Sequence, residues 1–262
     1  MFLAVSIDNS RITLAVYNDG ALLSCSYIST DIGKTADEYV LTLRGILSID
    51  GIAPADILSC LISSVVAPLS PVFTDAIFKL TGRVPTFVGP GIKTGLSIKI
   101  DNPAQLGSDI VAASVGALCL APPPIIIIDL GLATTMSVIN DDGAFIGTII
   151  IPGITSALKA LERAAGSLPA ISLDAPKTLI GKNTVDSMRS GALYGTCSML
   201  DGMISKIRAT LSAVPTVFAT GEHAPLILPH CEHDMTLAPN LLTDGLAHLS
   251  QINMHCTRNS GQ

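Results

Sequence analysis

The chain has 262 residues, of which 48% are hydrophobic and only 14% are charged, and its formal net charge at pH 7 is −6. This length fits one large domain or two domains of about 130 residues each, with enough apolar side chains for a sizeable core. The acidic balance and the lack of a basic cluster argue against nucleic acid or a membrane surface as a partner.

Two long runs without charged residues, 57–74 and 111–128, approach the length of a membrane-spanning helix. Prolines interrupt both runs, so neither makes a lipid-embedded helix. No basic segment precedes an apolar stretch at the N-terminus, as a secretory signal would require. Cysteines are scattered and mostly lie in apolar segments, which indicates buried thiols rather than a disulfide framework; they are residues 25, 60, 119, 197, 231 and 256. We therefore expect a cytoplasmic protein without a membrane anchor.

The first half of the chain opens with a predicted three-strand meander over residues 1–28. Apolar and polar residues alternate there, and turn residues interrupt the pattern twice. Apolar spacing predicts helices over 35–49, 71–81 and 104–120, and further strands over 57–66 and 85–88. A glycine-rich loop at 89–95 follows the last of these strands.

The second half opens on the most informative stretch of the chain, residues 125–135, which reads Ile-Ile-Ile-Ile-Asp-Leu-Gly-Leu-Ala-Thr-Thr. Four consecutive β-branched residues predict a strand that is buried on both faces. Asp129 ends this strand and must meet a metal, a hydrogen-bond donor or a ligand, because burying an unpaired carboxylate is costly. With Gly131 for a tight turn and the hydroxyls of Thr134 and Thr135, the stretch fits a phosphate-binding hairpin. The alternative is a core strand that ends in an ordinary turn.

Two further strands, at 136–139 and 144–151, make the second half begin with the same meander as the first. Helices are expected over 153–165, 184–214 and 240–252, and one more strand over 216–220. The prolines at 122–124 form the best linker, so we place the domains at residues 1–121 and 122–262. Two domains that open with the same motif indicate a duplicated fold with the ligand between them.

The order of the motifs resembles that of the type III pantothenate kinases, within the acetate kinase, Hsp70 and actin superfamily. One matching segment is Asn102-Pro103-x-x-x-Gly107-x-Asp109, and another is Asp129-x-Gly131-x-Ala133-Thr134-Thr135. The others lie in the same order at 63–68, 91–96, 147–153, 168–169, 181–184, 190–195, 220–221 and 241–246.

This resemblance implies an α/β fold of two actin-like (ribonuclease H-like) domains, each a five-stranded mixed sheet flanked by helices, with the active cleft between them. It implies ATP-dependent phosphorylation of the primary hydroxyl of pantothenate, a step of coenzyme A biosynthesis. It also implies a homodimer that needs Mg²⁺ and a monovalent cation, K⁺ or NH₄⁺.

The resemblance also assigns roles to residues of this chain. Asp109 is implied as the general base that accepts the hydroxyl proton, a task for which phosphoryl transfer commonly uses a carboxylate. Asp129 and Asp8 are implied as metal ligands. The nucleotide and its phosphates are assigned to Asp8, Asn9, Ser10, Gly131, Thr134, Thr135 and Gly221, and the substrate to Gly107, Thr184, Lys93 and Gly95.

Some of these residues also have an interpretation that involves no function. Carboxylates are common near helix N-termini for the helix dipole alone, which applies to Asp109. Lys93 also fits an ordinary exposed loop. His230, Cys231 and His233 have the spacing of metal ligands, but a polar surface loop is the better interpretation because no second ligand pair follows.

Several positions depart from the family motifs. Ser6 stands where the first phosphate loop has its carboxylate, and Asp8 stands where it has a glycine, unless a shift of two residues puts Asp8 in the carboxylate position. Leu132 replaces a threonine, and Ile110 replaces an arginine that would engage the substrate carboxylate. Loss of such a charge-assisted contact typically costs about 1.5–3 kcal/mol.

Thr148 and Glu222 replace glycines in two further motifs, and Glu222 adds a second acidic side chain towards the nucleotide. These changes leave three hypotheses. The first is a type III pantothenate kinase-like protein, with activity that is weak or lost. The second is a catalytically inactive paralogue with a binding or regulatory role, and the third is a kinase of the same fold for another small hydroxyl substrate without a carboxylate.

Overall fold

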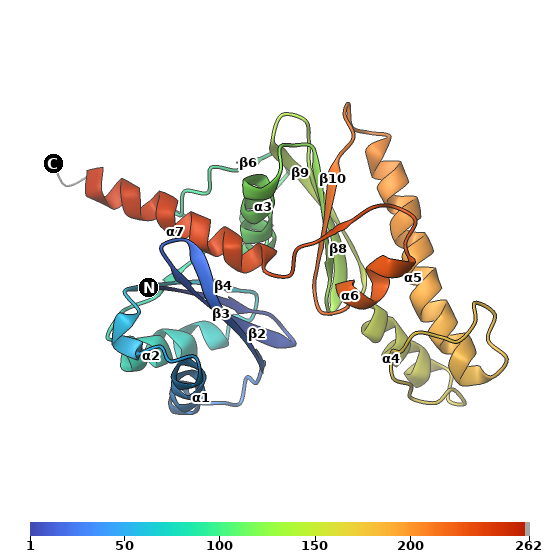
Figure 1. Cartoon of the computed structure of the whole chain (residues 1–262), viewed down its shortest axis with the longest axis horizontal. Helices are drawn as coiled ribbons and strands as arrows, with labels where there is room; N and C mark the ends of the chain where they lie inside the picture. Colours follow the sequence, from blue (N-terminus) through green and yellow to red (C-terminus); the bar gives the residue numbers. More distant parts are fainter. Residues whose placement is uncertain (260–262) are drawn as a thin grey trace. The chain divides into compact units, whose positions relative to one another are not determined.

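The structure, a computed structural model, describes residues 1–259 and the side chains of residues 1–253 (Figure 1). The chain forms two compact units. Unit 1 contains residues 1–96, 102–119 and the segment from Leu241, and unit 2 contains residues 97–101 and 120–240. The sequence analysis placed everything after residue 121 in a second domain, whereas here the segment from Leu241 groups with unit 1.

Unit 1 is built on a five-stranded mixed sheet with the order β3-β2-β1-β4-β5. The strands are β1 (Phe2–Ile7), β2 (Arg11–Asn18), β3 (Ala21–Ser29), β4 (Ser59–Ser64) and β5 (Thr86–Phe87). The first three form an antiparallel meander, and β4 and β5 continue the sheet in parallel. The helices are α1 (Ala36–Ile49), α2 (Leu69–Thr81), α3 (Ser108–Leu120) and α7 (Leu241–Asn259), with short 3-10 turns at Pro54–Asp56 and Pro103–Gln105.

Unit 2 is built on a six-stranded mixed sheet with the order β11-β10-β7-β8-β9-β6. The strands are β6 (Ser97–Ile98), β7 (Ile125–Leu130), β8 (Ala133–Ile139), β9 (Ala144–Pro152), β10 (Thr216–Thr220) and β11 (Thr236–Leu237). The helices are α4 (Ile154–Ala164), α5 (Thr184–Arg208) and α6 (Ala224–Ile227), and the 3-10 turn η3 (Leu228–His230) follows α6.

The two sheets share one strand plan. The order β9-β8-β7-β10-β11 in unit 2 repeats β3-β2-β1-β4-β5 in unit 1, with an antiparallel meander followed by two parallel strands in both. This confirms the predicted duplicated fold and the mixed α/β class. The second sheet has six strands instead of the predicted five, because Ser97 and Ile98 pair in parallel with the edge of β9.

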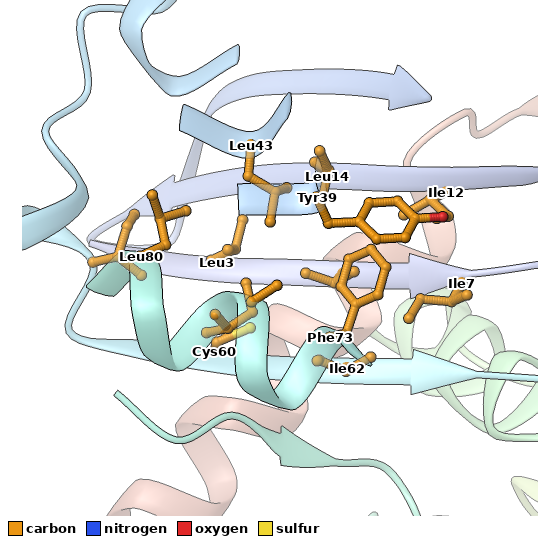
Figure 2. Close-up of a cluster of buried hydrophobic side chains, with 14 of the residues drawn as sticks. Leu3, Ile7, Ile12, Leu14, Tyr39, Leu43, Cys60, Ile62, Phe73 and Leu80 are labelled. Atoms are coloured by element: carbon orange, nitrogen blue, oxygen red, sulfur yellow. The ribbon is translucent and has the colours of Figure 1, made fainter. Parts of the chain in front are cut away.

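The core of unit 1 explains why β1 reads as an almost continuous apolar run. All six of its residues are buried, so both of its faces are covered. One face meets α1 and α2, where the rings of Tyr39 and Phe73 lie 4.7 Å apart and Leu3 and Ile7 point towards them (Figure 2). The strand β1 also packs against α7.

Glycines allow α3 and α7 to cross at backbone distance in unit 1. A Cβ atom on Gly116 would overlap the carbonyl oxygen of Leu241, and one on Gly245 would overlap the carbonyl oxygen of Ala112. The hydroxyl of Tyr17 on β2 donates to Asp244 of α7 at 2.7 Å. These contacts group the segment from Leu241 with unit 1.

Three predicted helix boundaries differ from the structure by four residues or more, and one of them is the end of the last helix, expected at residue 252 but found at Asn259. The helix expected from residue 104 begins at Ser108, because residues 103–105 form a separate 3-10 turn capped by the Asn102 side chain. The helix expected to run to residue 214 ends at Arg208. Beyond it, the backbone N–H groups of Ser212 and Ala213 donate to the Asp141 carboxylate at 3.1 and 2.9 Å and so leave the helical pattern.

The described cysteines are free thiols, and their burial varies. Cys60 and Cys197 are buried, as predicted, whereas Cys119 near the end of α3 is exposed. The side chain of Cys256 lies outside the described residues. Within the described part of the chain, no helix is long and apolar enough to cross a membrane.

Candidate active site

Three polar residues of unit 1, Asp8, Ser63 and Ser108, lie near the ends of β1 and β4. These strands are parallel and in register, so their carboxyl ends lie side by side. Asp8 is the first residue after β1. The Ser63 hydroxyl at the end of β4 lies 2.8 Å from the Ser108 hydroxyl, which also accepts the backbone N–H of Ser64 at 3.2 Å. Ser108 therefore fastens the first turn of α3 to the end of β4.

Asp109 follows Ser108 in the first turn of α3. Its Oδ1 atom is buried and has no hydrogen-bond partner among the described residues. Burial raises the pKa of the Asp109 carboxyl, the backbone N–H groups of Ile110 and Asp109 oppose this rise, and the negative charge of Asp8 adds to it. The two carboxylates are thus close enough to interact. A buried carboxylate with an unused lone pair and a raised pKa suits a general base.

Gly107 makes room for this carboxylate. A Cβ atom at position 107 would overlap the Asp109 Oδ1 atom. The sequence analysis assigned Gly107 to substrate binding, and the structure gives it a steric reason to lack a side chain.

Asn9 and Ser10 lie in the exposed turn between β1 and β2. The backbone N–H of Asn9 donates to Asp8 Oδ1 at 2.6 Å, so this turn holds the Asp8 carboxylate in place. Ser6 is the penultimate residue of β1, and its side chain is buried.

Lys93 and Gly95 lie in the glycine-rich loop of unit 1. The loop is fastened to α7, because the Lys93 N–H donates to Asn253 Oδ1 at 3.0 Å and the Lys93 carbonyl accepts from Asn253 Nδ2 at 2.9 Å. Gly95 has a φ of +68°, which favours glycine. No hydrogen bond described for the chain joins this loop to Asp109.

The β7–β8 hairpin of unit 2 carries the residues predicted for phosphate binding. Asp129 pairs with Thr135 across the ladder, and Leu130 pairs with Thr134. Residues directly opposite each other share a face of the sheet. Thr135 therefore shares the face of Asp129, whereas Thr134 lies on the other face with its side chain buried.

The end of β10 passes close over Asp129. Gly221 has a φ of +92°, and a Cβ atom there would lie 2.5 Å from Asp129 Oδ1 and 2.6 Å from the Leu130 carbonyl carbon. Gly131, at the hairpin turn, is also near, since its Cβ would lie 3.5 Å from Asp129 Oδ1. Two glycines thus bring backbone close to the Asp129 carboxylate, an arrangement that suits a cradle for a cation or a phosphate group.

His223 lies beside this cradle and was not predicted from the sequence. Its Nε2 atom is 3.4 Å from both Thr155 Oγ1 and Glu222 Oε1. Its backbone N–H donates to the Leu130 carbonyl at 3.2 Å. The sequence offered one indication of its role, because His223 comes two residues after Gly221, just beyond the end of a buried strand. Glu222, expected to repel the nucleotide, has a partner that offsets its charge when the imidazole is protonated.

Thr184 is the exposed first residue of α5. It lines a cavity of about 910 Å³ that lies between α4 and the N-terminal half of α5. Its rim is polar at 182–184, and its walls are mainly apolar, with side chains of Ile151, Leu158, Leu168, Met188 and Met199.

Among the described residues, no three His, Cys, Asp or Glu side chains lie close enough together to hold a metal ion. Mg²⁺ usually keeps several waters and uses one or two carboxylates together with substrate phosphates. The Asp8 carboxylate just beyond β1 fits such an ion as one of its ligands. His233 instead contacts Asp201, at 3.2 Å, which agrees with the interpretation of residues 230–233 as a loop.

Comparison with known proteins places the chain among named relatives. The sequence profile of the type III pantothenate kinases matches residues 2–206. The type III pantothenate kinase of Halalkalibacterium halodurans is 39% identical over 227 residues, which cover 87% of this chain and 89% of the relative. That of Anaeromyxobacter dehalogenans strain 2CP-C is 37% identical over 253 residues, 97% of this chain and 100% of the relative.

Solved structures share the fold at low sequence identity. A ROK family glucokinase from Streptomyces griseus, solved with glucose and AMPPNP, matches with a TM-score of 0.50 and 13% identity. The match covers 96% of this chain and 98% of the glucokinase. This likeness concerns the fold alone.

Proposed function

The chain belongs to the type III pantothenate kinase family, and on this premise we propose that it transfers the γ-phosphoryl group of ATP to the primary hydroxyl of pantothenate. Relatives of that name match it over nearly its full length. The observation that carries the proposal is the buried Asp109 carboxylate, whose Oδ1 has no partner within the described structure and whose charged neighbour is Asp8.

Asp109 is the base of this reaction. It accepts the proton of the substrate hydroxyl while the hydroxyl oxygen attacks the γ-phosphorus of ATP, and the bond from that phosphorus to the bridging oxygen breaks to release ADP. Burial raises the pKa of Asp109 and thereby makes the ionised carboxylate a stronger proton acceptor. Ser108 is a positioning residue, because it fixes the turn that carries Asp109.

Asp8 supplies the carboxylate that Ser6 does not. It stands just beyond the end of β1 beside Asp109, and Mg²⁺ bound there would neutralise phosphate charge during transfer. Asp129 would hold the monovalent cation in its backbone cradle. The bare backbone at Gly131 and Gly221 suits contact with phosphate oxygens and the nucleotide.

The substrate side of the proposal rests on family resemblance, which assigns Gly107, Thr184, Lys93 and Gly95 to pantothenate. The residue after Asp109 is Ile110, which cannot make a charge-assisted contact with the substrate carboxylate. We therefore expect weak discrimination in favour of a carboxylate on the substrate.

The test is ADP release by the purified chain with Mg²⁺, K⁺ and ATP. We expect pantothenate to stimulate ADP release. The alcohol analogue of pantothenate should have a kcat/KM within about tenfold of that for pantothenate, a difference of about 1.4 kcal/mol, because Ile110 makes no charged contact with the carboxylate. Ile110→Arg should widen the preference for pantothenate. Stimulation by neither compound would establish the inactive paralogue, and stimulation by the analogue alone would establish a different substrate.

We propose further that the chain is a homodimer, joined through the face formed by α4 and α5. The supporting observation is the large cavity on this face, whose walls are mainly apolar, since exposed apolar surface of this extent commonly marks an interface. A second copy of the chain would cover it.

Light scattering during gel filtration tests the homodimer. We expect a mass of about 54 kDa, twice the 27.1 kDa of the chain. Gly195→Glu places a charge in the cavity wall and should yield monomers, because a Cβ at position 195 meets no atom within 4 Å of its own chain. Gly202→Glu, equally open on α5 but outside the cavity, is the matched control and should remain dimeric. A monomeric wild-type chain would refute the proposal.

A further inference from the structure

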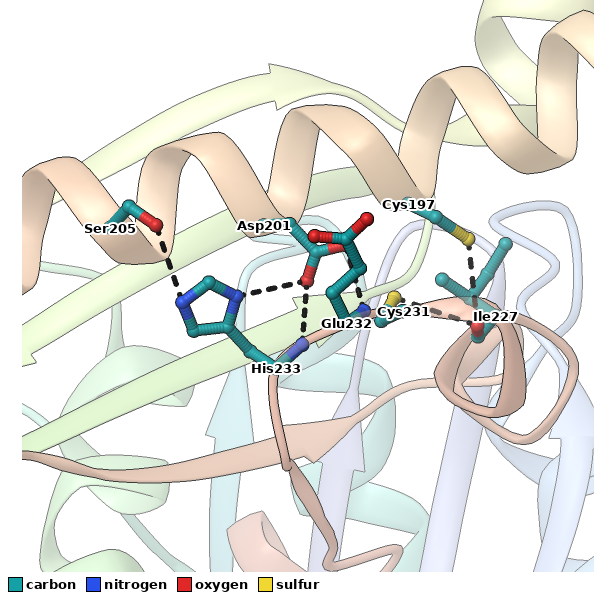
Figure 3. Close-up of polar contacts among 7 residues, drawn as sticks. All are labelled: Cys197, Asp201, Ser205, Ile227, Cys231, Glu232 and His233. Atoms are coloured by element: carbon teal, nitrogen blue, oxygen red, sulfur yellow. Dashed lines mark hydrogen bonds and ion pairs between the residues drawn. The ribbon is translucent and has the colours of Figure 1, made fainter.

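Two thiols of unit 2, Cys197 and Cys231, face the same carbonyl oxygen. Cys197 lies on α5, and Cys231 directly follows η3. Each sulfur is 3.6 Å from the carbonyl oxygen of Ile227, and Figure 3 shows both side chains converging on it. Each thiol also perturbs the pKa of the other. Because both sulfurs lie within 3.6 Å of one oxygen atom, they are close to each other, although 34 positions separate the two cysteines in the sequence.

Asp201 holds the segment of Cys231 against α5. It lies one helical turn after Cys197, on the same side of the helix. Its carboxylate accepts the backbone N–H groups of Glu232 and His233, at 2.9 and 3.0 Å, and lies 3.2 Å from His233 Nδ1. Figure 3 shows these contacts beside the thiol pair. Asp201 thus anchors the segment that carries Cys231 to the same helix as Cys197.

We propose that Cys197 and Cys231 are a reversible dithiol–disulfide pair that reacts with small disulfides. Cys231 is half-buried and reachable from solvent, whereas only 3% of Cys197 is exposed. The Cys231 thiolate attacks the small disulfide, so a mixed disulfide forms and one small thiolate leaves. The Cys197 thiolate then attacks the Cys231 sulfur, and the second small thiolate leaves. The two protons of the protein thiols end on the two small thiols, and the protein dithiol is oxidised as the small disulfide is reduced.

The interaction between the thiols sets the order of rates. It lowers the pKa of Cys197, and Cys197 together with burial raises the pKa of Cys231. The thiolate is the attacking species. The first attack, by Cys231, is therefore the slow step, and its rate rises with pH. Once formed, the disulfide links α5 to the segment that follows β10 and Gly221 in the chain.

The experiment treats the full chain with oxidised glutathione and counts free thiols after unfolding. We expect the thiols of Cys197 and Cys231 to be lost from the titre, and neither cysteine to carry glutathione. In Cys119→Ser, which lacks the exposed thiol, the titre should fall from five per chain to three. Proteolysis under non-reducing conditions should yield one linked peptide pair that contains Cys197 and Cys231. Dithiothreitol should restore all six thiols.

Single substitutions separate the pair from the other cysteines. Cys231→Ser and Cys197→Ser should both lose the linked peptide. In Cys197→Ser, the mixed disulfide with glutathione should remain on Cys231. Cys119→Ser, which removes an exposed thiol of unit 1, is the matched control and should oxidise like the wild type. A stable glutathione adduct on Cys231 of the wild type, a different linked pair or no reaction would each overturn the proposal. The outcome does not depend on kinase activity.

Discussion

Asp109→Asn is expected to lower kcat for pantothenate-dependent ADP release by about 10²–10⁴-fold, the range that a general base contributes. The amide keeps the size of the side chain but cannot accept the hydroxyl proton. The measurement is the coupled ADP-release assay at saturating ATP and pantothenate, with circular dichroism to verify the fold.

The same substitution is expected to raise the thermal midpoint of unfolding. The pKa of Asp109 is raised in the folded state, so the folded chain binds a proton more readily than the unfolded chain. Stability therefore falls as pH rises from the unfolded pKa through the folded one, and it stays reduced at neutral pH. Asparagine removes this ionisation and its destabilising effect.

Asp141→Asn provides the opposite control. The N–H groups of Ser212 and Ala213 lower the pKa of Asp141 in the folded state, so its ionised form stabilises the fold above the unfolded pKa. We expect this variant to have a lower midpoint and full activity. If Asp109→Asn instead lowered both the midpoint and the activity, Asp109 would be a structural residue rather than the base.

Gly245→Ala is expected to reduce the free energy of unfolding by about 3 kcal/mol, the upper range for inserting one carbon into a packed contact. The added methyl group would overlap the carbonyl oxygen of Ala112, and it would also lie 3.0 Å from the backbone nitrogen of Gly116. Backbone atoms of two packed helices cannot move aside as a flexible side chain can. Urea unfolding followed by circular dichroism measures the loss.

Gly45→Ala is the matched control in the same unit. Gly45 lies within α1, and a Cβ atom there meets nothing within 4 Å. Alanine at such a position stabilises a helix by about 0.5–1 kcal/mol. Equal effects of the two substitutions would mean that α3 and α7 do not cross at backbone distance.

The longer elements could be predicted because their signals are local. The isoleucines of β7 and the turn residues at 8–10 and 18–20 specify strands and hairpins by composition and periodicity alone. The two-residue strands β6 and β11 were missed, because two residues within a loop carry no period, whereas the equally short β5 falls inside the predicted strand 85–88. The grouping of α7 with unit 1 depends on Gly116 and Gly245, whose close approach no local pattern reveals.

The candidate site divides in the same way. Asp129 could be found because a carboxylate ends a buried strand, and Asp109 because it lies in a motif shared with relatives. Ser108 and His223 were missed, since each matters through a partner on another element. The sequence alone also could not decide between Ser6 and Asp8, whereas the folded chain buries the first and sets the second beside Asp109.

The place of α7 also bears on the order in which a growing chain can fold on the ribosome. Unit 1 begins with β1, yet the hydroxyl of Tyr17 finds its buried partners, Thr243 and Asp244, only after more than 220 further residues have been synthesised. Contacts of such long range form slowly and late. Unit 2 ends at residue 240, so the ribosome completes it before α7. Until α7 emerges, the nascent N-terminal sheet is an incomplete surface that chaperones can recognise.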